Sequence, residues 1–158
     1  MRPVITFSAL AFALAACNSV LETTGGNDRT GPLLELAARR AQWNEQEIQS
    51  YDFHYVCTCP SPCTEFSQQP VTIEVRDAVI ASVVDEDGNA LAPVTGVSWP
   101  TIDSLYVWAQ LVLSDQSLGV QVLFDPTDHY VTRLRHFPFG SESALTDHVV
   151  SEFVAVTR

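Results

Sequence analysis

Apolar and polar residues alternate between Tyr51 and Cys63, and this alternation is the clearest structural signal in the chain. A period of two is typical of an extended strand, which turns every second side chain to the same face. Pro60 and Pro62 lack the N–H group that a sheet ladder requires, so the strand is expected to end before them. The side chains that share one face are those of Tyr51, Phe53, Tyr55, Cys57 and Cys59. The pattern therefore predicts a core strand that leads into a group of three cysteines, Cys57, Cys59 and Cys63.

The same kind of pattern predicts the other elements of the fold. Apolar residues recur at helical spacing in two stretches, each preceded by a threonine that could cap a helix, Thr30 and Thr101. The expected helices are 32–50 and 101–115, and the expected strands are 51–59, 71–76, 79–84, 119–125, 130–137 and 148–156. Short turns join several neighbouring strands, which favours antiparallel pairing. We therefore expect a two-layer α+β domain with an antiparallel sheet of about six strands and two helices, in the order α-β-β-β-α-β-β-β.

The first sixteen residues predict a secretory signal peptide. Arg2 is followed by an apolar run of thirteen residues, Val4 to Ala16, which has the length of a signal-peptide core and is too short for a permanent membrane span. The run ends in Leu14-Ala15-Ala16-Cys17, which resembles the lipobox of bacterial lipoproteins. By that resemblance, Cys17 becomes the mature N-terminus and carries acyl chains on its sulfur and its amine. The predicted location is the cell envelope, with the outer membrane facing the periplasm favoured in a Gram-negative cell because Asn18, rather than aspartate, follows the cysteine.

Composition divides the remainder into a tether and one domain. Residues 17–31 comprise the lipidated Cys17 and a stretch rich in Asn, Ser, Thr and Gly that predicts a flexible tether, and 32–158 is long enough for a single domain. The chain has no lysine, and of its eight arginines Arg2 is lost with the signal peptide, so seven positive charges face nineteen Asp and Glu residues and the mature net charge is −12. Such a charge repels phosphate backbones and excludes a nucleic-acid partner. The expected partners are a membrane, through the lipid anchor, and another envelope protein.

The cysteines allow two kinds of chemistry. In an oxidising compartment, Cys63 could form a disulfide with either Cys57 or Cys59, and an odd number of thiols leaves one unpaired. Alternatively, His54, Cys57, Cys59 and Cys63 together offer a ligand set suited to Zn(II) or Cu(I). Strand alternation argues against this metal site, because it turns His54 away from Cys57 and Cys59.

Five motifs in one order resemble an uncharacterised family of bacterial secreted proteins and lipoproteins. They are Trp43…Ile48…Tyr51, Cys57-Thr-Cys59-Pro60, the 75–83 hairpin, Thr101-Ile-Asp-Ser-Leu-Tyr106 and Val120-Gln-Val-Leu-Phe-Asp-Pro126. The resemblance runs from about Trp43 onward and implies a Cys57–Cys59 bridge, after the family's two-cysteine pattern. The chain departs from the family at Ala78, where the family commonly has glycine, and at His129-Tyr130-Val131, where it has Gly-Tyr-Pro. The family supplies no established activity.

No catalytic motif or phosphate-binding loop stands out in the sequence. We therefore interpret the chain as an envelope lipoprotein of unknown biochemical function and expect a non-enzymatic protein-binding module without a cofactor. The alternative is a lipoprotein that binds a small ligand or a metal through Cys57, Cys59 and Cys63.

Overall fold

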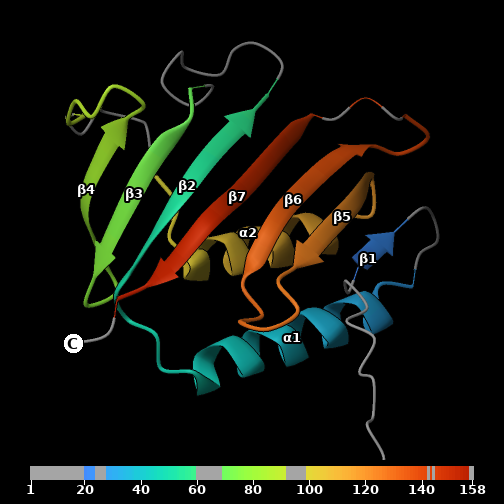
Figure 1. Cartoon of the computed structure of the whole chain (residues 1–158). Coiled ribbons are helices and arrows are strands. Elements are labelled where there is room, and N and C mark those ends of the chain that lie inside the picture. The colour runs from blue at the N-terminus through green and yellow to red at the C-terminus, as the bar shows by residue number, and fades with distance from the viewer. Residues whose placement is uncertain are drawn as a thin grey trace, which may run out of the picture.

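The computed structural model describes residues 20–23, 28–59, 69–91, 99–141, 143 and 145–156. These residues form two helices and a seven-stranded antiparallel sheet with the strand order β1-β5-β6-β7-β2-β3-β4 (Figure 1). The helices are α1 (Thr30–Glu45) and α2 (Ile102–Ser114), and the strands are β1 (Val20–Thr23), β2 (Tyr51–Thr58), β3 (Val71–Arg76), β4 (Val79–Asp85), β5 (Leu118–Phe124), β6 (Val131–Pro138) and β7 (Thr146–Ala155).

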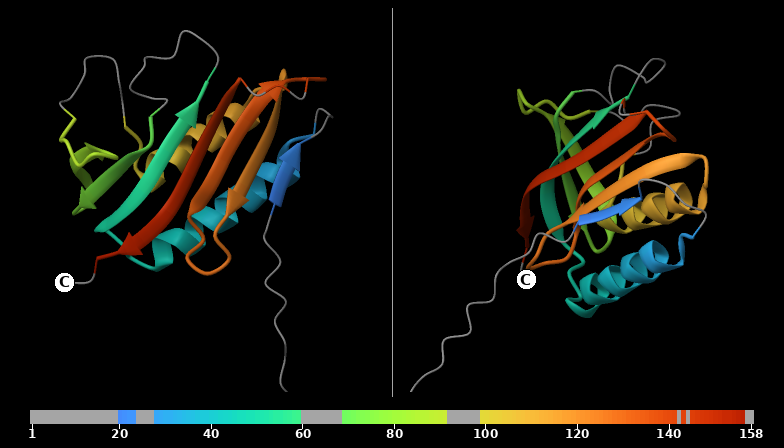
Figure 2. Two further views of the ribbon diagram at one scale, coloured as in Figure 1. Left: turned by 45° about the horizontal axis from the view of Figure 1, so that its top comes forward. Right: turned by 90° about the vertical axis from the view of Figure 1, so that its right-hand side faces the viewer.

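Both helices lie on the same face of the sheet, and the core fills the space between the two layers (Figures 1 and 2). On β2 the predicted alternation is confirmed, because Tyr51, Phe53, Tyr55 and Cys57 are all at most 5% exposed. The helix layer contributes five fully buried residues of α2, namely Ile102, Leu105, Tyr106, Ala109 and Leu113. The α+β class is thus confirmed, with seven strands in place of the expected six or so.

The additional strand, β1, lies inside the segment predicted to be a tether. Its residues pair with β5 from Val20 opposite Leu123 to Thr23 opposite Val120. The prediction of a flexible tether over 17–31 is therefore wrong for these four residues, and α1 also begins inside the segment. Only two of its four side chains, Leu21 and Thr23, are buried, and one of them is polar, so no alternation of apolar and polar residues marks this strand. A strand of four residues depends on its pairing with β5 and cannot be recognised from its own sequence pattern.

The helix boundaries show which local signals were reliable. Thr101 caps α2 as expected, with its hydroxyl accepting a hydrogen bond from the Ser104 N–H and the Ser104 hydroxyl accepting one from the Thr101 N–H. Thr30 does not cap α1, because α1 begins at Thr30 itself and its cap position makes no side-chain hydrogen bond. The helix also ends at Glu45 rather than near Ser50. Neither helix is both long enough and apolar enough to span a bilayer, as far as the described residues extend.

Two tight turns occur where the chain departs from the family pattern. Asp77 and Ala78 both have positive φ, 51° and 62°, as a two-residue hairpin turn requires. The strained turn is held by the preceding segment, since the Ala78 N–H donates to the Gln49 carbonyl and the Asp77 N–H donates to the Ser50 hydroxyl. His129 has a φ of 61° in the β5–β6 turn, and the Tyr106 hydroxyl donates to its carbonyl. Tertiary hydrogen bonds thus stabilise positions where glycine would adopt positive φ without strain.

Candidate functional site

The structure separates the predicted cysteine cluster into residues with different environments. Cys17 and Cys63 lie outside the described residues. Cys57 lies on the core face of β2, is 5% exposed and carries a free thiol. Cys59 follows the end of β2 and is disulfide-bonded, to a partner outside the described residues. The structure therefore contains neither of the bridges that would use Cys57, including the Cys57–Cys59 bridge implied by the family resemblance.

His54 lies on the opposite face of β2 from Cys57, as strand alternation predicts. Its imidazole Nε2 is 3.5 Å from a carboxylate oxygen of Glu152, and both side chains are exposed to solvent. A metal ion could not be held by His54 and Cys57 together without breaking the strand. Within the described ranges, no three His, Cys, Asp or Glu side chains are grouped so as to hold a metal ion.

The core face of the sheet instead brings Cys57 together with residues that the sequence left scattered. Cys57 on β2 is directly opposite His148 on β7. The hydroxyl of Tyr55, two residues before Cys57, lies 2.7 Å from His148 Nδ1. Trp108 of α2 covers the imidazole, with the two ring centroids 5.2 Å apart. We call Tyr55, Cys57, Trp108 and His148 the buried polar cluster; Tyr55 and Cys57 are buried, and Trp108 and His148 are half-buried.

Burial sets the protonation states in the buried polar cluster. Burial, together with the nearby charge of His136, lowers the pKa of His148 to about 4. Burial also raises the pKa of the Cys57 thiol. At neutral pH the pair is therefore a neutral imidazole beside a neutral thiol. A neutral, enclosed thiol is a poor nucleophile, so this arrangement favours a structural role over covalent chemistry.

Strand alternation predicts that Tyr55 and Cys57 share one face of β2. It does not predict that His148 lies beside them. Period-two alternation on β7 puts His148 and Val150 on one face, yet only the register between β7 and β2 pairs His148 with Cys57. That register joins residues about ninety positions apart in the chain. No local pattern encodes it, which is why His148 was not recognised as a member of a cluster.

The other face of the sheet is not covered by either helix, and we call it the open face. A row of cross-strand neighbours runs over it from Leu123 through Arg133 and Val149 to Val56. The Arg133 guanidinium forms a two-point ion pair with Asp147 in the adjacent row, with Nε 2.8 Å from Oδ1. The apolar members of this row, Leu123, Val149 and Val56, are all partly exposed.

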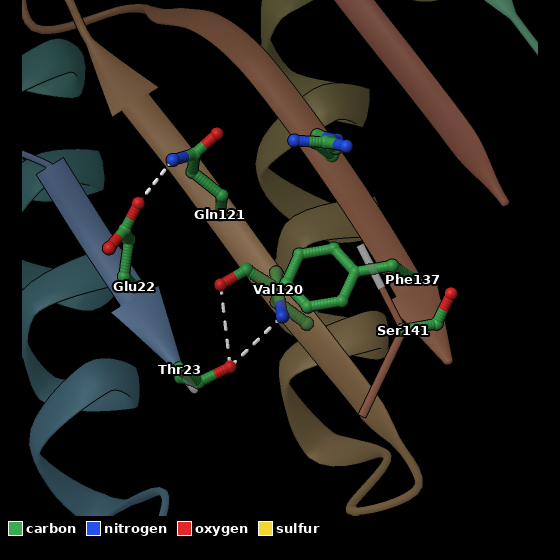
Figure 3. A pocket seen from close by; sticks show the side chains of 7 residues that line it. Glu22, Thr23, Val120, Gln121, Phe137 and Ser141 are labelled. Carbon is green, nitrogen blue, oxygen red and sulfur yellow. Dashed lines mark hydrogen bonds between the residues drawn. The ribbon is translucent and has the colours of Figure 1, made fainter. Parts of the chain in front are cut away.

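The open face is hollowed at its β1 edge. The hollow has a volume of about 360 Å³ and is lined by Glu22, Thr23, Val120, Gln121, Arg135, Phe137 and Ser141 (Figure 3). The Phe137 ring lies across Gly119, where an added Cβ would come within 2.0 Å of it, and so forms one wall. The Gln121 amide donates to the Glu22 carboxylate, and the Thr23 hydroxyl bonds both backbone groups of Val120. No sequence motif marked these residues, because β1 itself was not predicted.

The comparisons with known proteins agree with the expected resemblance at its coarsest level. Residues 35–136, about two thirds of the chain, match the model of a family of unknown function, DUF6174. No curated protein and no solved structure matches the chain. The match covers α2 and the strands β2 to β5 in full, together with α1 from Glu35 onward and most of β6. The chain therefore belongs to the DUF6174 family of unknown function.

Proposed function

We propose that the chain is exported and lipidated on Cys17, and that its domain is a non-enzymatic module that binds another envelope protein through the open face. The N-terminal pattern supports export and lipidation, as argued from the sequence. The open face supports binding, because its central row combines partly exposed apolar side chains with Arg133, whose charge is already paired with that of Asp147. This combination is the single observation that carries the proposal.

The row through Arg133 resembles the centre of a protein interface in its chemistry. Interface centres are poor in uncompensated charge, and desolvating a charge is less costly where its partner stays beside it. Arg133 keeps Asp147 as its partner, and Arg76 further along the face keeps Asp52 at 2.5 Å. In both pairs the positive charge is compensated within the face itself. We infer that its partner presents a mainly apolar strip of protein surface rather than a basic one.

The buried polar cluster supports a non-enzymatic role. Its thiol and its imidazole are both neutral at pH 7, and Trp108 of α2 covers the imidazole. Tyr55 is 4% exposed, which keeps the hydrogen bond to His148 away from solvent. Groups held in this way stabilise the contact between α2 and the sheet.

Crosslinking in intact cells tests the proposal. A photo-crosslinking residue at Ser151, on the open face, is expected to capture an envelope protein, and Val149→Lys is expected to reduce the captured amount at least tenfold. A lysine at position 149 places an unpaired charge in the row. Binding of the partner would have to desolvate this charge, which lowers the affinity for the partner. Leu34→Lys serves as the matched control, because Leu34 is 66% exposed on α1, on the helix side of the sheet. Equal capture by both variants, or capture of nothing above background by the parent, would count against the proposal.

A second candidate function is the binding of a small ligand, and the hollow at the β1 edge favours it over the cysteine cluster. An aromatic wall with an amide, a carboxylate and a hydroxyl around it is a reasonable small-molecule site. The cysteines are less suitable, because Cys59 is already in a disulfide and Cys57 is enclosed. A ligand of the hollow would lose affinity in Phe137→Ala and keep it in Val149→Lys, which separates the two functions.

A further inference from the structure

The link between the proposed lipid anchor and the folded domain is very short. β1 begins at Val20, three residues after Cys17. Three trans peptide steps of 3.8 Å span at most about 11 Å. The inference that follows rests on the proposed lipidation of Cys17. Given that lipidation, we propose that the end of the sheet where β5 and β6 are joined lies against the bilayer surface.

β1 is attached firmly enough to transmit this restraint to the domain. Leu21 is 3% exposed and belongs to the hydrophobic core. The Thr23 hydroxyl accepts a hydrogen bond from the Val120 N–H at 3.0 Å and donates one to the Val120 carbonyl at 3.3 Å. Beyond β1, the buried Arg29 donates to the Leu118 carbonyl at 2.6 Å and ties the start of α1 to β5. The link could gain only Val20 before Leu21 would have to leave the core.

The register of β1 with β5 identifies the end of the sheet that faces the bilayer. Val20, the first residue of β1, is opposite Leu123, close to the end of β5. The β5–β6 turn, residues 125–129, therefore lies next to the anchor. Asp125 braces this turn by accepting hydrogen bonds from the backbone N–H groups of Thr127 and Asp128, and Gln46 donates to the Asp128 carbonyl. Because Gln46 directly follows α1, the C-terminal end of α1 lies at the same corner.

The opposite end of β5 and β6 must then point away from the membrane. β5 has seven residues, and a strand of that length spans about 24 Å. Its first residue, Leu118, pairs with Pro138, so the β6–β7 connection lies at the distal end. The open face would stand upright on the bilayer and remain accessible along the length of its strands, as the proposed binding role requires.

The chemistry of the β5–β6 turn favours resting on the surface over insertion into it. Its exposed residues are Pro126 and Thr127, and its carboxylates, Asp125 and Asp128, are repelled by anionic headgroups. A turn that inserted would be expected to present aromatic or long aliphatic side chains to the lipid. The contact is therefore imposed by the short link and not by affinity of the turn for lipid.

Fluorescence quenching by headgroup-nitroxide lipids in phosphatidylcholine vesicles tests this orientation. The lipidated protein, with Cys57→Ala to leave one reactive thiol, carries a fluorophore at Thr127→Cys or, as the matched control, at Ser143→Cys in the exposed β6–β7 connection. Quenching is expected to be at least threefold stronger at position 127. Insertion of ten Gly and Ser residues between Ser19 and Val20 is expected to reduce it to the level at position 143.

Two results would overturn the orientation. Equal or reversed quenching of the two positions, in protein whose intact mass shows the acyl chains, would contradict it while leaving the lipid anchor in place. Protein that carries no acyl chain would overturn both the anchor and the orientation. Quenching at position 127 that is unchanged by the ten-residue insertion would show that the turn itself binds lipid, and would contradict the role given to the short link.

Discussion

Lowering the pH from about 6.5 to about 4 is expected to reduce the free energy of unfolding by about 3 kcal/mol through His148 alone. The unfolded imidazole binds a proton with its ordinary pKa near 6.5, whereas burial lowers the pKa in the folded protein to about 4. Between these values the unfolded state holds more protons, so stability falls as the pH falls and stops falling from this cause below about 4. His136, whose pKa is also lowered by burial, contributes in the same direction.

Urea unfolding at several pH values, followed by tryptophan fluorescence, measures this dependence. His148→Gln is expected to remove at least half of the decrease, because the Gln carbonyl oxygen can still accept a hydrogen bond from Tyr55 but does not titrate between pH 6.5 and 4. His54→Gln, on the exposed face of β2, is the matched control and is expected to keep the full decrease. If His148→Gln and the parent lost stability equally over this range, the buried environment assigned to His148 would be wrong.

Replacing Trp43 with alanine is expected to cost about 3–5 kcal/mol of folding free energy, as for other large core aromatics. Trp43 and Leu36 are the buried residues of α1, so the packing of this helix on the sheet depends on them. The indole contacts the rings of Tyr51 and Phe153 edge-on, with both centroid distances at 5.8 Å. Its removal leaves a cavity at the junction of α1, β2 and β7.

The midpoint of urea unfolding at pH 7 gives this loss, and Leu34→Ala on the same helix is the control. Leu34 is 66% exposed, so its truncation is expected to change stability by less than about 0.5 kcal/mol. Trp43→Phe retains part of the packing and is expected to fall between the two, which keeps the comparison informative if Trp43→Ala does not fold. Similar losses for Leu34→Ala and Trp43→Phe would contradict the core position of Trp43.

The sequence was informative where one local signal decides the structure. The alternation from Tyr51 to Cys57 correctly predicted β2 and its buried face, and Thr101 correctly marked the start of α2. The sequence was uninformative where contacts with a distant segment determine the local structure. β1 exists because β5 offers an edge to it, and Ala78 accepts a positive φ because Gln49 and Ser50 hold the turn.

The candidate sites show the same division. Local alternation correctly separated His54 from Cys57, but the pairing of Cys57 with His148 depends on the register of two strands far apart in the chain. The hollow depends on β1 and on the Phe137 ring folding over Gly119, and neither is visible in a local pattern. Cys57 was expected among the disulfide candidates, and its burial beside Tyr55 explains how its thiol would stay reduced in the oxidising compartment that we propose for the chain.

Intact mass spectrometry of protein extracted from membranes, alkylated before or after unfolding, tests the central claim most directly. The account predicts a chain that begins at an acylated Cys17, contains one disulfide, and has one thiol that reacts with iodoacetamide only after unfolding. Because Cys57 is free, Cys63 is the partner expected for Cys59. A chain with an unmodified Cys17, or one whose remaining three thiols are all alkylated, would contradict it.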